Sequence, residues 1–463
     1  MKKLIILLVA LAFTHSLIAQ EKELPPKGGT PKGFTLPKKE VIKLDNGLKL
    51  VLIPYGAIPK ATINISIKTG NIHEKENEIW LSDLTIDLMK EGSQTMTSKE
   101  ISNKMAGMGG NLDMTVLSHT TTLSTSVLSD FSDDAIALMA DVLLRPKWPS
   151  NELPRLKNDR KRYLEISLSQ PQSQASKDFY ATIYPDHPYG RIYPNAEQID
   201  RYSIENIKNF YDTNFGAQRT TIYVVGKFNK DKVIKAVRAG FNDWIKGPEV
   251  SYPIATAVTE GKVKIIDRPG APQSTIMYGL PVIDPSNPDY TALEVMNSIL
   301  GGSFGSRITS NIREDKGYTY SPYSNIDTNY KSGVWYESAD VTTEFTGASL
   351  NEINKEIYRL QNEPPTIEEL DGIKNYESGI FVLQNSTPNG IIGQLNFLDV
   401  HNLDDDYLKN RVMNILAVTP EQVQEMAKKY IIPKNMTLIV VGDKEKIEKQ
   451  MNETINQKDK LKQ

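Results

Sequence analysis

The sequence predicts an α+β fold built from two similar domains, and three observations lead to this prediction. The segment YDTNFGAQRTTIYVVGKFNKDKV, at residues 211–233, recurs in outline as YIIPKNMTLIVVGDKEKI at residues 430–447. Each copy indicates a helix, a short turn, a strand rich in β-branched residues, and a glycine turn into another helix. The remaining segments alternate between strand and helix patterns, and a linker-like stretch separates the two copies. Self-similarity on this scale indicates a duplicated domain.

The first 19 residues have the layout of a secretory signal peptide. Two lysines at the start precede an apolar run from Leu4 to Phe13, and small residues follow at Ser16 and Ala19. The run is shorter than the roughly 20 apolar residues of a membrane-spanning helix. We therefore expect cleavage and export, with an uncleaved anchor as the alternative. Residues 20–40 mix Pro, Gly and Lys without periodicity, which favours an extended leader.

The composition limits both the chemistry and the location of the protein. The chain has no cysteine, which excludes disulfides, thiolate metal sites and cysteine nucleophiles. The net charge is only −3 and has no long run of one sign, whereas a nucleic-acid-binding protein needs a basic face. An exported chain without cysteine indicates the periplasm. We expect no contact with nucleic acid, and none with the membrane after signal cleavage.

The two domains are expected at residues 41–245 and 263–455, joined by a linker at residues 246–262. The linker belongs to the stretch DWIKGPEVSYPIATAVTEGK, whose composition is typical of an interdomain connection. In the first domain, Thr97 and Glu100 form a capping box that predicts the start of a helix, and TTTLSTSVLS predicts a strand.

One further helix start is predicted in the second domain. Asn287 and Pro288 have the residue types of an N-cap and a first helical residue, and Leu293, Met296 and Leu300 follow at helical spacing.

The sequence contains no motif for a mononuclear zinc centre. Such a site needs two histidines one helical turn apart, with a carboxylate to activate the bound water. No two histidines of this chain lie within a turn or two of each other; they are His15, His73, His119, His187 and His401. A site built from histidines distant in sequence stays open as an alternative. The sequence also lacks G-x-S-x-G, and LGGSFGSR at residues 300–307 lacks the lysine and spacing of a P-loop.

The segment SRITSNIREDKGYTYSPYS contains a possible oxyanion-binding pair. It places Arg313 near the end of a short helix and Tyr320 on a strand that follows a glycine turn at Gly317. A guanidinium and a phenol that converge can donate hydrogen bonds to a developing oxyanion. The alternative is a charged helix end followed by a tyrosine-rich strand. Upstream, Gly301 and Gly302 either stop a helix or allow backbone to approach a bound chain.

Several segments together resemble the pitrilysin and insulinase family of zinc peptidases, especially its two-domain branch, which includes mitochondrial processing peptidase. They occur in family order at family spacing, and they are KLDNGLKLVLIPY (43–55), KTGNIHE (68–74), EGSQTMTSKEI (91–101), HPYGR (187–191) and NIREDKGYTYSPYS (311–324). The resemblance implies that each domain is a mainly antiparallel sheet with helices packed on one face. It also implies that the chain forms one half of a clamshell.

The zinc motif of the family is missing from this chain. Zinc-binding members carry H-x-x-E-H just before the position of EGS, where this chain reads LSDLTIDLMKEGS. Asp83 and Asp87 stand in place of the two histidines, and Ile86 stands in place of the glutamate that activates water. Glu165 corresponds to the third ligand. The resemblance therefore implies no metal and no cofactor in this chain, and we expect these acids on a solvated helix face.

The substrate-contacting motif of the family is present. Family peptidases use an arginine and a tyrosine seven positions apart, which is the spacing of Arg313 and Tyr320, and a glycine-rich loop precedes them. The resemblance implies a catalytic role for Arg313 and Tyr320 and a substrate-binding role for Gly301 and Gly302.

In paired-subunit members, one chain supplies the zinc and the other supplies the arginine and tyrosine. The predicted function is thus the non-zinc subunit of an exported heterodimeric metallopeptidase, acting on peptides or unfolded polypeptides. Zinc is expected in a partner that carries H-x-x-E-H. The alternative is a catalytically inactive peptide-binding or structural subunit.

Overall fold

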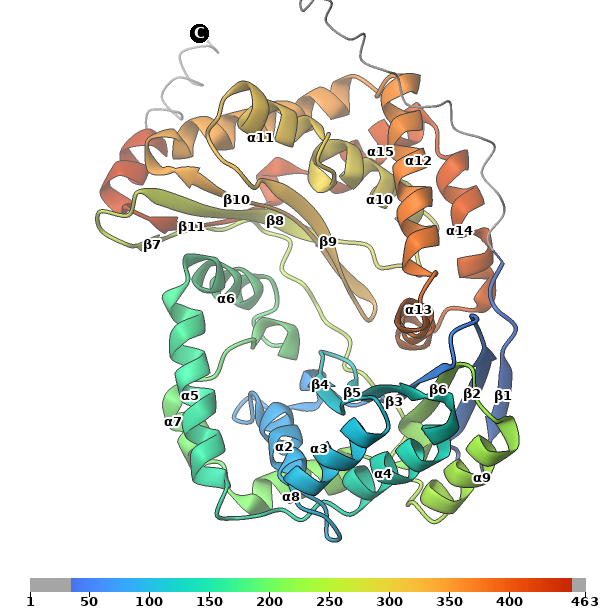
Figure 1. Cartoon of the computed structure of the whole chain (residues 1–463). Coiled ribbons are helices and arrows are strands. Elements are labelled where there is room, and N and C mark those ends of the chain that lie inside the picture. The colour runs from blue at the N-terminus through green and yellow to red at the C-terminus, as the bar shows by residue number, and fades with distance from the viewer. Residues whose placement is uncertain (1–34, 452–463) are drawn as a thin grey trace, which may run out of the picture. The chain divides into compact units, whose positions relative to one another are not determined.

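The computed structural model describes residues 35–451 and contains two β-sheets, each with its own helices (Figure 1). The first sheet has the strand order β1-β2-β6-β3-β5-β4, and the second has the order β7-β11-β8-β10-β9. The α+β prediction with two similar sheets is confirmed. The predicted signal peptide and most of the predicted leader lie outside the described residues.

The first half of the molecule, residues 35–241, holds the first sheet. Its strands are β1 (Glu40–Lys43), β2 (Lys49–Pro54), β3 (Lys60–Ile67), β4 (Asp113–Val116), β5 (Thr121–Leu128) and β6 (Thr220–Gly226). Only the β2–β6 pair is parallel. The longer helices are α2 (Leu81–Lys90), α3 (Ser98–Gly107), α4 (Ser132–Leu144), α5 (Leu153–Ser169), α6 (Pro171–Ile183), α8 (Ile204–Asn214) and α9 (Lys230–Phe241). The shorter ones are η2 (Asn71–His73), η3 (Ser129–Phe131), η4 (Pro188–Gly190), α7 (Ala196–Arg201) and η5 (Ala217–Arg219).

The second half, residues 263–451, holds the second sheet. Its strands are β7 (Val263–Asp267), β8 (Gln273–Val282), β9 (Tyr323–Asn329), β10 (Ser332–Thr342) and β11 (Thr437–Gly442). Its α-helices are α10 (Tyr290–Asn297), α11 (Thr346–Asn362), α12 (Ile367–Gln384), α13 (Pro388–His401), α14 (Asp405–Ala417) and α15 (Pro420–Tyr430). Two segments are π-helices, η6 (Ser298–Gly302) and η7 (Thr309–Asp315), and two are short 3-10 helices, η8 (Thr343–Phe345) and η9 (Pro433–Asn435).

The internal repeat corresponds to two equivalent strands, β6 and β11. Each strand is fully buried, and each has one parallel and one antiparallel neighbour. Both strands end at the glycine of a Val-Val-Gly sequence, Gly226 and Gly442, and a helix follows in both cases, α9 and the helical residues 444–451. The duplication that the sequence predicted is therefore present in the topology.

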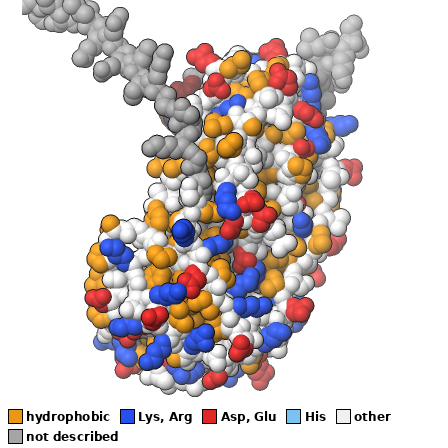
Figure 2. Space-filling view, turned by 90° about the vertical axis from the view of Figure 1, so that its right-hand side faces the viewer, with side chains coloured by type: hydrophobic (Ala, Val, Ile, Leu, Met, Phe, Trp, Pro, Cys, Tyr) orange, Lys and Arg blue, Asp and Glu red, His pale blue; other side chains and the backbone are white. Residues whose placement is uncertain are grey.

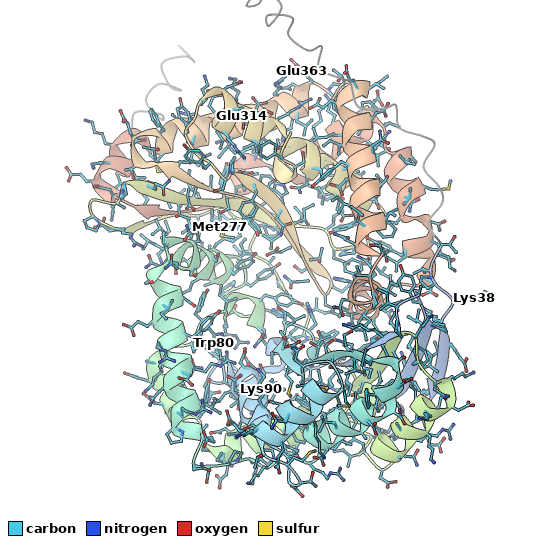
Figure 3. All side chains as sticks on the ribbon, viewed as in Figure 1. Lys38, Trp80, Lys90, Met277, Glu314 and Glu363 are labelled. Carbon is cyan, nitrogen blue, oxygen red and sulfur yellow. The ribbon has the colours of Figure 1, made fainter. Side chains whose placement is uncertain are left out.

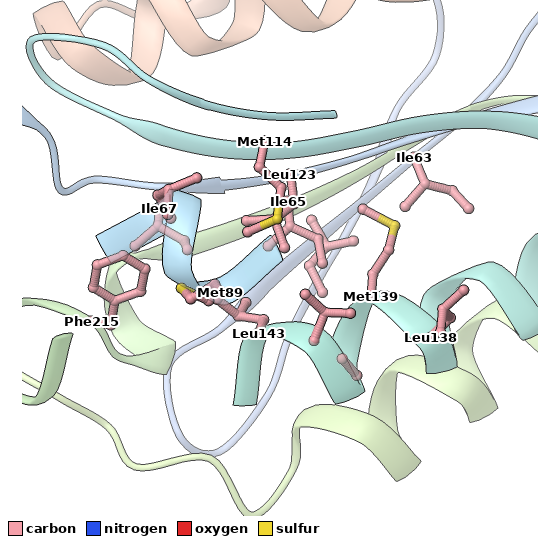
Figure 4. Packing of buried hydrophobic residues seen from close by; sticks show 14 of the residues in the cluster. Ile63, Ile65, Ile67, Met89, Met114, Leu123, Leu138, Met139, Leu143 and Phe215 are labelled. Atoms are coloured by element: carbon pink, nitrogen blue, oxygen red, sulfur yellow. The ribbon is translucent and has the colours of Figure 1, made fainter. Parts of the chain in front are cut away.

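The first core lies between the first sheet and its own helices. Successive residues of a strand point to opposite faces, so every second residue of β3 faces the helices. Figure 4 shows these residues packed against methionine and leucine side chains, and the set includes Ile63, Ile65, Ile67, Met89, Leu123, Met139 and Leu143. The second sheet has a matching core against α10, α11 and α15.

The other face of each sheet is covered by a helix from the opposite half. Helix α13 of the second half packs on β2 and β6, through Ile391, Ile392, Leu395 and Leu398 against Val51, Ile53, Tyr223 and Val225. Helix α6 of the first half packs on the second sheet, through Ala175, Phe179 and Ile183 against Met277, Val334, Tyr336, Ile439 and Val441. Figure 1 shows both helices against these sheets. The two halves are therefore interlocked rather than merely adjacent.

Local predictions are confirmed in part. Thr97 and Glu100 form the predicted capping box of α3, and the strand predicted after His119 is β5. The predicted helix start is wrong by two residues, because the N-cap of α10 is Asp289 and the helix begins at Tyr290. The Asn287 side chain instead accepts a hydrogen bond from the Asp289 N–H and forms a turn before the helix.

The connection between the halves, residues 242–262, contains no helix or strand, and the proposed linker lies within it. Within residues 35–451, no helix combines the length and apolar character needed to cross a membrane. Figure 2 shows Lys and Arg side chains interspersed with Asp and Glu on one face of the molecule. That face has no extended basic area of the kind that nucleic acid requires.

Candidate functional site

Helix α2 carries an arginine-bridged pair of aspartates. Asp83 and Asp87 lie one turn apart and therefore share one face of the helix. Arg160, on α5, lies between them: its Nη1 is 3.2 Å from Oδ1 of Asp83, and its Nε is 2.6 Å from Oδ2 of Asp87. The three side chains are only 20–23% exposed. The expectation of a solvated face is wrong for Asp83 and Asp87, because they form a largely buried ion-pair cluster.

Neighbouring polar groups fix this cluster and the start of α2. The Asn71 side chain donates to Asp83 Oδ2 at 3.0 Å. Burial raises the pKa of Asp83, and Arg160 counteracts the shift. Glu74 accepts hydrogen bonds from the backbone N–H groups of Trp80 and Ser82 at the beginning of the helix. Burial raises the pKa of Glu74 to about 8.

These residues do not fit a zinc ion. Ile86, at the position of the water-activating glutamate, is buried in the first core, and Glu165 is exposed on α5. The Arg160 guanidinium, a planar group with five N–H donors, occupies the space between the carboxylates. Within residues 35–451, no three or more His, Asp or Glu side chains are arranged to hold a metal ion.

Arg313 lies near the end of η7 with its guanidinium partly accessible. Its Nε is 3.1 Å from Oε1 of Glu314, and its guanidinium carbon lies 4.5 Å from the ring centroid of Phe304. The Arg313 side chain is 31% exposed. Figure 3 labels Glu314, which marks this end of η7 above the second sheet. A guanidinium held by one carboxylate and one ring face still has N–H donors for a ligand.

Tyr320 lies in the loop between η7 and β9 and is 86% exposed. The prediction that it lies on a strand is wrong, because β9 begins at Tyr323. The glycine turn before it is present, with Gly317 at a φ of 66°. Thr319 donates to the Asp340 carbonyl at 2.7 Å and so holds the loop next to β10. In the described part of the chain, no hydrogen bond joins Tyr320 to Arg313.

Gly301 and Gly302 form the end of η6, which continues α10. A Cβ atom at Gly301 would lie 2.5 Å from Ser324 Oγ and 2.7 Å from Glu337 Oε2. A Cβ atom at Gly302 would lie 2.4 Å from Asn297 Nδ2. Close packing thus explains why glycine is required at both positions, which is consistent with the helix-stop interpretation. Their predicted role in substrate binding stays a prediction.

A cavity of about 600 Å³ lies between the two halves. Residues near η2 and α2 line one side, including Asn71 and Trp80, and the edge strand β9 lines the other. Figure 3 labels Trp80 between α5 and α2. Sequence reasoning missed this cavity, because the residues that line it come from segments far apart in the chain.

The structure also brings together four histidines that the sequence leaves unconnected. His73 and His119 both pack against Tyr252, and His119 and His187 both pack against Tyr189. His401 lies close enough to lower the pKa of His119. His119 Nε2 accepts from the backbone N–H of Tyr330, which lies in the turn between β9 and β10, at 3.3 Å. Burial lowers the pKa of His119 to about 3 and those of His73 and His401 to about 4.

The structure is a duplicated α+β protein whose α2 aspartates are bridged by an arginine, and comparisons with family profiles identify its class. Residues 50–196 match the insulinase family profile (peptidase family M16), and residues 201–376 match the profile described as peptidase M16 inactive domain. The chain belongs to the insulinase family.

Two curated relatives show how this family has been described. An uncharacterized zinc protease of Bacillus subtilis, YmxG, is 24% identical over 74% of this chain and 84% of its own length. A Helicobacter pylori relative, named non-peptidase homolog YmxG, is 19% identical over 84% of this chain and 90% of its own length.

Solved structures share the fold. A Helicobacter pylori protease superposes with a TM-score of 0.82 at 18% identity, over 88% of this chain and all of the other. A peptidase M16 inactive domain from Pseudomonas fluorescens gives 0.80 at 23% identity, over 87% of this chain and 98% of the other. The periplasmic protease PqqL of Escherichia coli gives 0.75 at 16% identity, over 94% of this chain and 50% of the other.

Proposed function

We propose that this chain is the non-zinc subunit of an exported heteromeric metallopeptidase. In this proposal, Arg313 and Tyr320 bind the carbonyl of a peptide whose hydrolysis takes place at the zinc centre of a partner that carries H-x-x-E-H. The observation that carries the proposal is a contrast between two sites. The α2 site is filled by Arg160, whereas Arg313 and Tyr320 keep the family spacing and reach the surface.

The chemistry expected of this chain is hydrogen-bond donation. A guanidinium and a phenol aimed at the position where a carbonyl oxygen becomes negative stabilise that charge, and removal of one such donor costs about 3–4 kcal/mol in other hydrolases. Phe304 and Glu314 restrain Arg313 before a peptide arrives, which reduces the entropy lost on binding. The partner supplies the water that attacks the carbonyl.

Two comparisons support a chain without peptidase activity of its own. Residues 201–376 match a profile described as an inactive domain, and the Helicobacter pylori relative is named a non-peptidase homolog. The signal-peptide pattern of residues 1–19 supports export, and we place the complex in the periplasm.

The same names also favour a second candidate, a catalytically inactive peptide-binding or structural subunit. A peptide-binding subunit would keep Arg313 and Tyr320 as well. The two functions differ in one result: a split peptidase cleaves peptides when mixed with the zinc-bearing partner, whereas a binding subunit does not.

The test substitutes the two donors in the assembled complex. R313A and Y320F should each lower kcat by about 10²–10³-fold while complex formation on size-exclusion chromatography is unchanged. R268A is the matched control, because Arg268 is an exposed arginine of the same half that donates to the Ser169 carbonyl and lies outside the segment that carries Arg313 and Tyr320. Full activity of the R313A complex would contradict the assignment.

A further inference from the structure

Glu337, in the middle of β10, is a buried acid without a hydrogen-bond partner. Its side chain is 0% exposed, and neither carboxyl oxygen has a partner among the described residues. Burial raises the pKa of Glu337 well above its usual value. The backbone of Tyr323 counteracts this shift, but neither oxygen reaches hydrogen-bonding geometry with it. The side chain is therefore a fully buried carboxyl group with unused polar atoms.

The polar neighbours of Glu337 donate their hydrogen bonds to Asn297 and not to the acid. Ser324 Oγ donates to Oδ1 of Asn297 at 2.7 Å, and the Trp335 indole donates to the same atom at 2.8 Å. Gly301 lies directly against the acid, since a Cβ atom there would be 2.7 Å from Glu337 Oε2. The acid thus faces backbone at the end of η6.

The segment above Glu337 leads to Arg313. We call residues 298–315 the glycine segment; it begins with η6, ends with η7 and contains Phe304 between them. Phe304 contacts the Arg313 guanidinium and belongs to the same segment as Gly301. π-helical turns are rare and occur frequently at functional sites. The glycine segment contains two π-helices, η6 at its beginning and η7 at its end.

An unpaired buried acid lowers the stability of the fold, and natural proteins keep such groups mainly where function compensates for the loss. We propose that Glu337 is a positioning residue that keeps the glycine segment able to move, so that Arg313 reaches its peptide-binding position. In the moved state, backbone N–H groups of the segment donate to the Glu337 carboxyl. This inference rests on the proposed function, because it assigns peptide binding to Arg313.

The first test removes the acid but keeps its volume. In E337M, we expect resistance to urea to rise and amide hydrogen exchange in residues 298–315 to slow by about tenfold. Affinity for a non-cleavable peptide should fall by a similar factor, because the bound conformation becomes rarer. S132A is the matched control. Ser132 also has a buried side-chain oxygen without a partner, but it lies in the first half, and we expect no change in exchange or affinity.

A second test does not depend on the folding of E337M. G301A should lower stability, because its new methyl group meets Glu337 Oε2 and Ser324 Oγ. E337A should restore part of that loss in the double variant, whereas additive effects would show that the two positions are not coupled.

The outcomes separate the two proposals. Unchanged exchange in E337M would overturn the role of Glu337. Slower exchange in E337M, together with no peptide binding by the unmodified protein, would support the coupling to the glycine segment and reject the proposed function. A more stable E337M that binds peptide as tightly as the unmodified protein would overturn the positioning role.

Discussion

The Nε atom of Arg160 lies 2.6 Å from Oδ2 of Asp87, so a side chain of α5 supplies the positive charge between the two acids of α2. Asp83 completes the bridge at 3.2 Å. In family members with zinc, the equivalent helix holds a metal ion. Here the positive charge belongs to the Arg160 side chain, which joins α5 to α2 through two ion pairs.

Replacement of Arg160 should therefore destabilise the first half. R160M removes the cation that bridges the two carboxylates and leaves Asp87 with Lys90 as its cationic partner among the described residues. We expect the free energy of unfolding to fall by about 1–3 kcal/mol, less than for a fully buried pair because the three side chains keep some exposure. Urea unfolding measures this change.

The control for this prediction is R155M on the same helix. Arg155 also has acidic partners, but it is 50% exposed, and we expect a loss of less than about 1 kcal/mol. A zinc chelator should leave the melting temperature of the unmodified chain unchanged. An equal fall in the free energy of unfolding in R160M and R155M would contradict the claim that the Arg160 bridge contributes more than an exposed ion pair.

The interlocked helices predict that the halves unfold together. F179A removes a ring that is fully buried between α6 and the second sheet, which should cost about 3–5 kcal/mol. Hydrogen exchange should increase in both sheets, because α6 belongs to the first half and covers the second. F304A, which shortens an exposed phenylalanine, should change stability by no more than about 0.5 kcal/mol. Faster exchange confined to one sheet in F179A would contradict the interlock.

The histidine cluster predicts loss of stability in acid. The unfolded chain binds a proton at His119 near pH 6.5, whereas the folded chain binds it only near pH 3. The contribution of His119 is therefore complete above pH 6.5, and it falls as the pH drops toward 3, by up to about 1.4 kcal/mol per pH unit. Glu74 acts in the opposite direction: its folded pKa of about 8 contributes stability below pH 4.5 that is lost as the pH rises toward 8.

The effect of His119 is therefore measured as a difference between two proteins. H119Q keeps an acceptor for the Tyr330 N–H but does not titrate. The difference in unfolding free energy between the unmodified protein and H119Q should shrink by about 1 kcal/mol or more between pH 6 and pH 5. A difference that does not vary with pH would show that His119 is not held neutral by burial.

The sequence predicted those features that depend on local patterns. The duplicated Val-Val-Gly strands and the capping box at Thr97 follow from residue types at fixed spacing, and both are present. The Arg160 bridge was not predictable, because no spacing rule connects α5 to α2. Tyr320 was placed on a strand because aromatic residues favour strands, but β9 begins only at Tyr323, after the loop held by Thr319.

The sequence also did not predict that α6 and α13 pack on the sheets of the opposite halves, or that the histidines lie close together. Both features depend on how the two halves pack, and the sequence contains no local signal for that packing. The apolar residues of α6, such as Phe179, have the pattern of any amphipathic helix. Nothing in that pattern says that the sheet they cover belongs to the other half.

The most direct test of the central claim measures peptide cleavage and bound metal together. The purified chain is assayed on a quenched peptide library alone, then mixed with a co-encoded relative that carries H-x-x-E-H, and the zinc content of each chain is determined. The account predicts activity only in the mixture, with zinc only in the partner. Activity with stoichiometric zinc in this chain alone would contradict it, because Arg160 would then not exclude a metal from α2.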